Sequence, residues 1–211
     1  MKPLQPHAFR PRTLRTLGAV GLLGLAAQTA VLVIAPFVRP DVDLMRDGLS
    51  HYAIGPGSGL QEAGFVMLGI ACAAIGIGLS TLSPSTRLAG WLLALASFGF
   101  VGLAIFPMGQ GGPMTPIGDL HLTAGTMGAI LQFAAALALL GSPVGCARLG
   151  ISRRTGWLLA GIAAGAAAGI QIAIWNQSLG LPEGLLARLA IAPLLVWWAM
   201  VAIALMRQGS G

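Results

Sequence analysis

Residues 16–38 read TLGAVGLLGLAAQTAVLVIAPFV, an apolar stretch that contains no charged side chain. A helix needs about 20 such residues to cross the roughly 30 Å of hydrocarbon in a bilayer. The stretch is too long for the apolar part of a secretory signal peptide, and no convincing small-residue cleavage site precedes Arg39. We therefore predict a retained membrane-spanning helix, preceded by a basic tail over residues 1–15.

The rest of the 211-residue chain repeats this pattern. The predicted spans cover about 16–38, 63–82, 88–108, 121–141, 155–175 and 184–206. Only 9% of the residues are charged, whereas an average soluble domain has about 25%. We predict an all-α fold, a polytopic membrane bundle of six transmembrane helices over residues 16–206, followed by a short tail over 207–211.

The distribution of charge predicts how the bundle is oriented. If the N-terminus is cytoplasmic, the inner segments carry most of the Lys and Arg residues, namely Lys2, Arg10, Arg12, Arg15, Arg87, Arg148, Arg153, Arg154 and Arg207. All six acidic residues then lie outside. An excess of basic residues marks the cytoplasmic side, so both termini are predicted to be cytoplasmic in a bacterial inner (plasma) membrane. The basic residues are scattered between apolar runs, which favours the bilayer as partner and disfavours nucleic acid.

The polar residues of the outer side form a candidate pocket. Its predicted members are Asp43, Asp47, His51, Tyr52, Glu62, Gln171 and Arg188. Asp43, Asp47 and His51 are spaced four apart, so on a helix they would share one face. Arg188 lies a turn inside the last span and needs a partner such as Glu62 or Glu183.

Three interpretations of this outer cluster remain open, and the sequence specifies no cofactor. Asp47, His51 and His121, with Asp119 or Glu62, would form a mixed nitrogen and oxygen metal site, although no HExxH spacing is present. Ser50 could instead act as a nucleophile with His121 as its base and Asp119 as the orienting acid. In the third interpretation Asp119 caps the fourth helix and the other acids form a hydrated rim.

Small and amide side chains inside the spans predict how the helices pack. The fifth span holds Gly161, Gly165 and Gly169, a stripe that lets another helix approach closely. We expect this stripe to pack inside the bundle, with a homodimer seam as the alternative. Three glutamines lie within spans: Gln28, Gln132 and Gln171. An unpaired amide is costly in hydrocarbon, so we expect them to form hydrogen bonds between helices.

Two groups of residues resemble a known family. The first is Ser50-His51-Tyr52-Ala53 with the glycine-rich stretch over 55–69, and the second runs from Phe106-Pro107 through Thr115 and Gly118 to Leu120-His121. Over about residues 18–205 the chain resembles the prokaryotic membrane family catalogued as domain of unknown function 998. The resemblance implies a six-helix bundle with no established activity, and it carries over a serine to Ser50 and a histidine to His121. Many members have an acid soon after the Phe-Pro pair, where this chain has Met108-Gly109-Gln110.

Two functions of different classes follow. The first is a membrane protein whose outer pocket binds or senses a lipid or small molecule, or supports a partner. The second is a membrane-embedded hydrolase of a lipid ester or amide that uses Ser50 and His121. A hydrogen bond between these two side chains, beside an aspartate, would favour the hydrolase, and a separation beyond about 6 Å without metal-like convergence would exclude it. Transport is disfavoured, because the spans carry no charge near the bilayer midplane.

Overall fold

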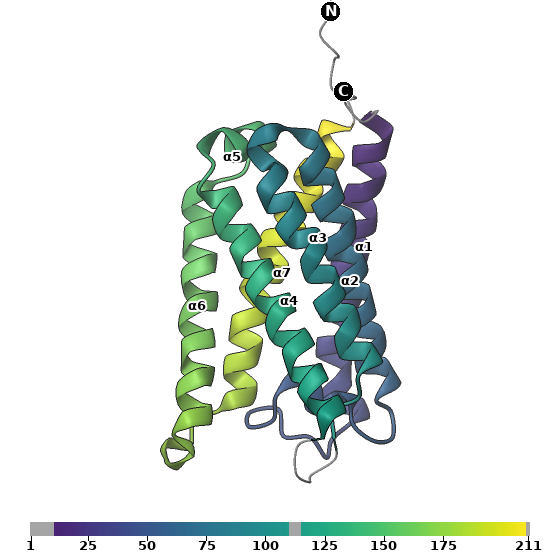
Figure 1. Ribbon diagram of the computed structural model, residues 1–211, viewed down its shortest axis with the longest axis vertical. Coiled ribbons are helices and arrows are strands. Elements are labelled where there is room, and N and C mark those ends of the chain that lie inside the picture. The colour runs from purple at the N-terminus through teal and green to yellow at the C-terminus, as the bar shows by residue number, and fades with distance from the viewer. Residues whose placement is uncertain (1–10, 110–114, 210–211) are drawn as a thin grey trace, which may run out of the picture.

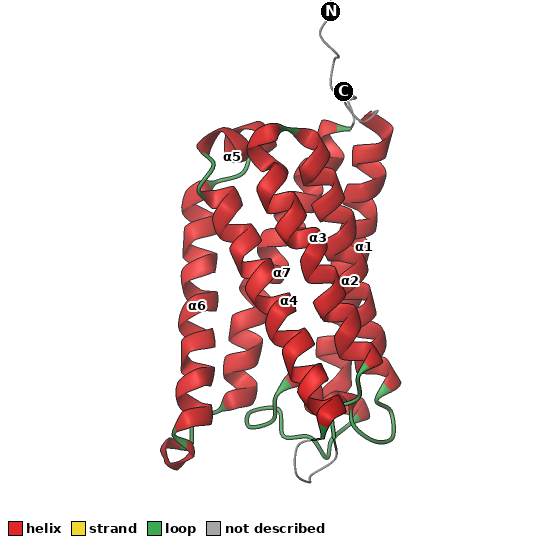
Figure 2. Cartoon of the chain, viewed as in Figure 1, coloured by secondary structure: helices red, strands yellow, loops and turns green. Residues whose placement is uncertain are grey.

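The computed structural model describes residues 11–109 and 115–209, and all the regular structure in these ranges is helical (Figure 2). The elements are α1 (Pro11–Val38), η1 (Leu49–Ala53), α2 (Gly59–Leu82), α3 (Pro84–Ile105), α4 (Pro116–Leu140), α5 (Pro143–Leu149), α6 (Arg153–Trp175), η2 (Gln177–Leu179) and α7 (Glu183–Gln208). Six helices are long and apolar enough to span a membrane. The predicted all-α fold with six spans is confirmed, and the chain is a multi-pass membrane protein.

Most helices begin several residues before the predicted spans. Proline opens α1, α3 and α4, where its missing N–H costs nothing because the first helical N–H groups have no intrahelical partner. Arg12 and Arg15 therefore belong to α1, and the predicted tail is wrong for residues 11–15. Residues 1–10 of that tail lie outside the described residues. At the other end, α7 continues to Gln208, two residues into the predicted C-terminal tail.

The connection between the fourth and fifth spans contains a helix that we did not predict. The Ser142 side chain accepts a hydrogen bond of 3.1 Å from the backbone N–H of Gly145, and Pro143 opens α5. Gly150 ends the helix with φ 66°, a left-handed conformation that glycine adopts without strain. A capped turn of this kind is too short and polar for a search based on apolar spans to find.

The six long helices form an incomplete ring. α1, α2, α3 and α4 pack each against the next, while α7 packs against both α1 and α6. α4 and α6 make few contacts, so the ring is open between them (Figure 1). Gln208 Nε2 donates to the Arg148 carbonyl at 2.8 Å, which joins the end of α7 to α5. The opposite end of the bundle carries η1, and we call it the η1 end (Figure 1).

Glycines let the central helices approach backbone to backbone. A Cβ atom on Gly76 of α2 would lie 2.6 Å from the backbone nitrogen of Ala94 on α3. A Cβ atom on Gly99 of α3 would lie 2.5 Å from the backbone nitrogen of Gly128 on α4. Both distances are too short for a side chain, so these contacts require glycine and allow extensive dispersion contacts along the helix pairs.

The glycine stripe of α6 behaves differently. A Cβ atom on Gly161 or Gly165 would meet nothing within 4 Å, whereas one on Gly169 would lie 3.1 Å from Cδ2 of Leu186. The prediction that this stripe packs inside the bundle is therefore wrong for Gly161 and Gly165. Both are exposed on the side of α6 that the other described helices leave uncovered.

The glutamines inside the spans do not form the predicted hydrogen bonds between helices. Gln28 and Gln132 are fully buried, and Gln171 is exposed. Both polar side-chain atoms of Gln28 and the Nε2 atom of Gln132 lack a hydrogen-bond partner among the described residues. The expectation that buried amides pair across helices is wrong at these two positions.

Candidate functional site

His121 and Ser50 are joined by a hydrogen bond at the η1 end. The Oγ atom of Ser50 lies 2.9 Å from Nε2 of His121, although 71 positions separate the two residues. His121 lies in the second turn of α4, which is fixed by Pro116 and by the Thr115 side chain accepting from the Gly118 N–H at 3.1 Å. Ser50 is half-buried in η1. The structure thus brings together the serine and histidine that the sequence singled out.

A backbone carbonyl sets the protonation pattern of His121. Its Nδ1 atom lies 2.7 Å from the carbonyl oxygen of Phe106. A carbonyl can only accept, so Nδ1 carries the hydrogen, and in the neutral ring Nε2 is left to accept the Ser50 hydroxyl. Phe106 ends α3 and precedes Pro107, and both features free its carbonyl from the helical pattern.

The surroundings of His121 are apolar. The imidazole is fully buried, and the Phe65 ring of α2 packs edge-on against it with centroids 6.4 Å apart and planes at 67°. In such a low-dielectric environment the two hydrogen bonds of the ring are stronger than they would be in water. The ring is therefore held in one orientation by α2, α3 and η1 together.

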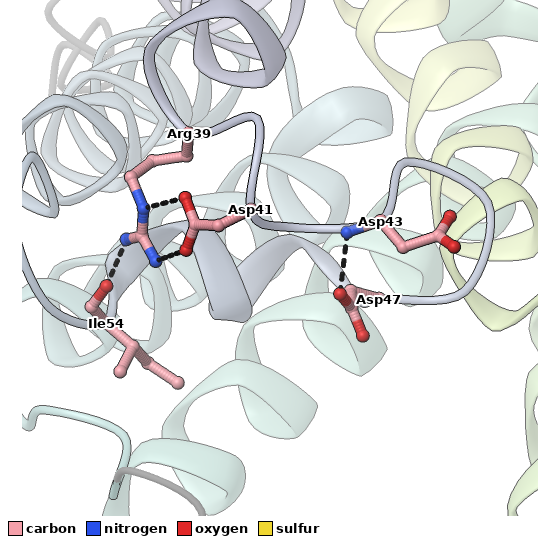
Figure 3. Close-up of polar contacts among 5 residues, drawn as sticks. All are labelled: Arg39, Asp41, Asp43, Asp47 and Ile54. Atoms are coloured by element: carbon pink, nitrogen blue, oxygen red, sulfur yellow. Dashed lines mark hydrogen bonds and ion pairs between the residues drawn. The ribbon is translucent and has the colours of Figure 1, made fainter.

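Ser50 lies in a loop that is held in shape by polar side chains of the loop itself. Figure 3 shows these polar contacts. Arg39 donates to both carboxylate oxygens of Asp41, at 2.9 and 2.7 Å, and also to the carbonyl of Ile54 just beyond η1. The Arg39 hydrogen bond and charge hold the pKa of the Asp41 carboxyl below its usual range, and Asp41 raises the pKa of Arg39. The Arg39 guanidinium therefore joins the segment before η1 to the segment after it.

Asp43, Asp47 and His51 do not share a helical face, because the chain forms turns over residues 39–48. The Asp43 carboxylate accepts from the N–H groups of Met45 and Arg46, at 2.8 and 3.2 Å. Asp47 accepts from the Asp43 N–H at 2.7 Å (Figure 3). His51 Nδ1 lies 3.3 Å from the carbonyl of its neighbour Gly48. These side chains satisfy local backbone groups, as is typical of aspartate in turns.

Arg188 holds the same loop from α7. Its guanidinium donates to the carbonyls of Leu44 and Gly184, each at 2.8 Å, and to the Tyr52 hydroxyl at 3.2 Å. It also lies 5.5 Å from the centroid of the buried Tyr52 ring, a cation–π distance. The predicted partner acids Glu62 and Glu183 form no ion pair with it in the described structure.

The remaining predicted groups do not converge on the dyad. Asp119 is exposed in the first turn of α4 and its side chain makes no hydrogen bond within residues 11–109 and 115–209, so Phe106 supplies the orienting acceptor that we expected from Asp119. Within residues 11–109 and 115–209, no three His, Cys, Asp or Glu side chains lie close enough to hold a metal ion. The candidate set Asp47, His51 and His121 is therefore not assembled.

A cavity of about 660 Å³ lies elsewhere, between α4, α6 and α7. Of the residues predicted to form an outer pocket, only Gln171 lines it. Its walls are largely alanine and aliphatic side chains, with Gln132 and Thr126 among the few polar residues. Its volume is in the range of small-molecule sites.

Comparison with known proteins places the chain in a family. The profile described as protein of unknown function (DUF998) matches residues 14–204. This range holds both members of the dyad and every long helix except the ends of α1 and α7. The chain belongs to the DUF998 family. Neither the curated proteins nor the solved structures include a match to this DUF998 protein.

Sequence reasoning missed the Phe106 carbonyl, since a backbone atom leaves no residue type to recognise. The Phe106-Pro107 pair was nevertheless a signal, because the residue before proline favours an extended backbone and rarely continues a helix. The buried Phe65 was also missed, as one apolar residue among many in its span. In this DUF998 protein His121 is oriented by a backbone carbonyl, that of Phe106, and by an apolar side chain, that of Phe65.

Proposed function

We propose that this DUF998 protein is a membrane-embedded hydrolase of lipid esters or amides. The observation that carries the proposal is the 2.9 Å contact between Ser50 Oγ and His121 Nε2, with Nδ1 bound to the Phe106 carbonyl. Serine is a weak nucleophile unless an adjacent base accepts its proton, and an oriented imidazole is the usual base. The dyad also lies at one end of the bundle, at the depth where lipid esters and amides meet water.

The reaction runs in two steps with these residues. Ser50 Oγ attacks the carbonyl carbon of the ester or amide while its proton passes to His121 Nε2. The tetrahedral intermediate expels the alcohol or amine, which takes the proton from His121 and leaves an acyl group on Ser50. Water then attacks the acyl-enzyme by the same route, releasing the acid and restoring the Ser50 hydroxyl.

A second candidate is binding or sensing of a lipid or small molecule without turnover. One observation favours it: His121 is oriented by the neutral Phe106 carbonyl, and no carboxylate accompanies it. A neutral carbonyl stabilises the charged imidazolium of the transition state less than a carboxylate would. In that case the Ser50–His121 bond would serve only to hold η1 on α4.

The two candidates differ in whether Ser50 reacts covalently. The full chain, reconstituted in lipid nanodiscs, is treated with a fluorophosphonate, and labelled peptides are identified by mass spectrometry. We expect modification of Ser50, and a labelling rate reduced on the order of 10²-fold or more in His121→Ala. Ser58→Ala is the matched control, because Ser58 is also half-buried at the η1 end and caps nothing with its side chain. It should label like the wild type.

Either of two results would contradict the hydrolase proposal. Absence of label on Ser50 in a folded wild-type chain favours the binding role. Equal labelling of the wild type and His121→Ala would show that His121 does not act as a base. The melting temperature of each variant, measured alongside, distinguishes loss of the base from loss of the fold.

A further inference from the structure

The open side of the helix ring forms a groove that faces the bilayer. In Figure 1, α4 and α6 meet beneath α5 and separate toward the η1 end, with α7 behind them. The cavity of about 660 Å³ lies between these three helices, and we call it the α4/α6/α7 groove. Its lining includes Ile130, Ala163, Ala167 and Ile191, and none of its lining residues is charged. Walls of this composition suit hydrocarbon.

One polar group in the groove lacks a partner. Gln132 lines the groove and is only 2% exposed, and its Nε2 atom has no hydrogen-bond partner among the described residues. An unpaired amide costs several kcal/mol in hydrocarbon, where no water replaces the missing bond. The buried Gln28 is also unpaired, but it packs beside Gly64 between α1 and α2 and does not line the groove. The Nε2 atom itself is inaccessible, so a bound molecule satisfies it only when the Gln132 side chain rotates toward the groove.

The depth of Gln132 restricts the class of ligand. Gln132 follows His121 by eleven residues and precedes Leu140, the last residue of α4, by eight, which places it roughly 16 Å from His121 and about 12 Å from the α5 end of the helix at 1.5 Å per residue. The ester carbonyls of a phospholipid stay near the headgroups, because the charged headgroup does not enter the hydrocarbon. A carbonyl at the depth of Gln132 must belong to a molecule that is dissolved in the bilayer core.

We propose that the α4/α6/α7 groove binds an uncharged, long-chain lipid whose carbonyl oxygen accepts a hydrogen bond from Gln132 Nε2. The hydrocarbon on either side of the carbonyl lies against the alanine and isoleucine walls. A helix from another protein would fill the groove as well, but its backbone carbonyls are bonded within the helix, so it would satisfy Gln132 only where a polar side chain faced that one position. The site does not depend on turnover at Ser50.

The experiment uses the full chain in nanodiscs and a symmetrical long-chain ketone labelled with ¹³C at its carbonyl. The matched alkane of the same length serves as the probe without an acceptor. We expect the chain to retain the ketone about fivefold better than the alkane, the effect of one hydrogen bond of about 1 kcal/mol in lipid. The infrared band of the bound carbonyl should shift to lower frequency, as a hydrogen-bonded carbonyl does.

Three variants make the test specific. Gln132→Leu should abolish both the preference for the ketone and the band shift, whereas Gln28→Leu should keep both. Ala167→Trp should exclude the ketone and the alkane together, because residue 167 is exposed and lines the groove, so that the large indole ring would fill it. Equal retention of ketone and alkane by the wild type would overturn the proposal, and so would an unchanged band shift in Gln132→Leu. Cross-linking from position 167 to a second chain, in preference to the ketone, would also overturn it.

Discussion

His121 is held by three neighbours that contribute different things. The Phe106 carbonyl fixes which nitrogen carries the hydrogen, Ser50 uses the other nitrogen, and Phe65 excludes water from one edge of the ring. Removing a buried histidine's partner leaves a polar atom unsatisfied, which costs roughly 1–3 kcal/mol. The dyad is thus a structural element of the η1 end whether or not it reacts.

The Arg39–Asp41 pair makes the loop that carries Ser50 sensitive to acid. The pKa of Asp41 is lowered in the folded chain, so the pair contributes stability above the unfolded pKa and loses it as the pH falls through the folded pKa. We expect backbone hydrogen exchange over residues 39–58 to become faster than the intrinsic chemistry explains only below the ordinary aspartate pKa of 3.8, as the pH falls through the lowered pKa of Asp41. Exchange measured by mass spectrometry across a pH series checks this.

Asp41→Asn and Asp119→Asn are the paired variants for that measurement. Asp41→Asn removes the ion pair at every pH, so the acid dependence of exchange that the pair contributes around Arg39 and Ile54 should be lost. Asp119 is exposed and its side chain has no hydrogen-bond partner among the described residues, so Asp119→Asn should keep the wild-type dependence. A wild-type loop whose corrected exchange does not vary with pH would contradict the role of the pair.

At the scale of the helices, two glycines of similar sequence context differ in what surrounds them. Gly76→Ala places a methyl group 2.6 Å from the backbone of α3, while Gly161→Ala places one in open space. Overpacking of this kind costs roughly 1–3 kcal/mol, so Gly76→Ala should lower the melting temperature. Gly161→Ala should leave it unchanged or raise it, since alanine favours helix more than glycine does. The two melting curves in one detergent provide the comparison.

The uncovered stripe of α6 leads to a prediction about association. We propose that Gly161 and Gly165 form a homodimer seam, with Gly169 at its edge against Leu186. Small residues four apart allow close packing of two helices in lipid. A Gly161→Leu, Gly165→Leu variant should be monomeric at protein-to-lipid ratios where the wild type dimerises, as single-molecule photobleaching would count. A wild type that stays monomeric throughout the range would rule out the seam.

For the whole molecule, the charge asymmetry predicts an orientation. Arg87, Arg153 and Arg154 lie at the end of the bundle that holds α5, and the loop with Asp41, Asp43 and Asp47 lies at the η1 end. We infer that the end with α5 faces the cytoplasm of a bacterial cell and the η1 end faces outward. A phosphatase reporter, active only outside, should be silent when fused after Arg154 and active when fused after Asp43. The opposite pattern would invert the proposed topology.

The sequence predicted the spans well because apolar length is a property of each segment alone. Apolar length alone misses the starts of the helices, which are marked by prolines at the first helical position, Pro11, Pro84 and Pro116. The sequence also could not show that Asp43 and Asp47 fold a turn, because their spacing of four fits a helix equally well. The groove could not be predicted from the sequence, because it arises from the loose contact between α4 and α6, which is not a property of either segment alone.

The candidate site was partly accessible for a different reason. Ser50 and His121 carry reactive side chains in otherwise apolar surroundings, so chemistry alone drew them together as a hypothesis. Their actual contact required the loop over 39–58 to fold back onto α4, and that depends on Arg39 and Arg188 binding backbone carbonyls. Acceptors of this kind exist at every residue, so a sequence offers no way to choose among them.

The order of residues around His121 has a consequence for biosynthesis. Ser50, Phe65 and Phe106 all precede His121, so these three partners of the imidazole have been synthesised before α4 is complete. The α4/α6/α7 groove needs the last two long helices, and Arg188 is among the last charged residues to be translated. A nascent chain stalled after α5 should therefore contain every residue of the dyad, while the groove and the Arg188 anchor on which the Ser50–His121 contact depends are still to be synthesised.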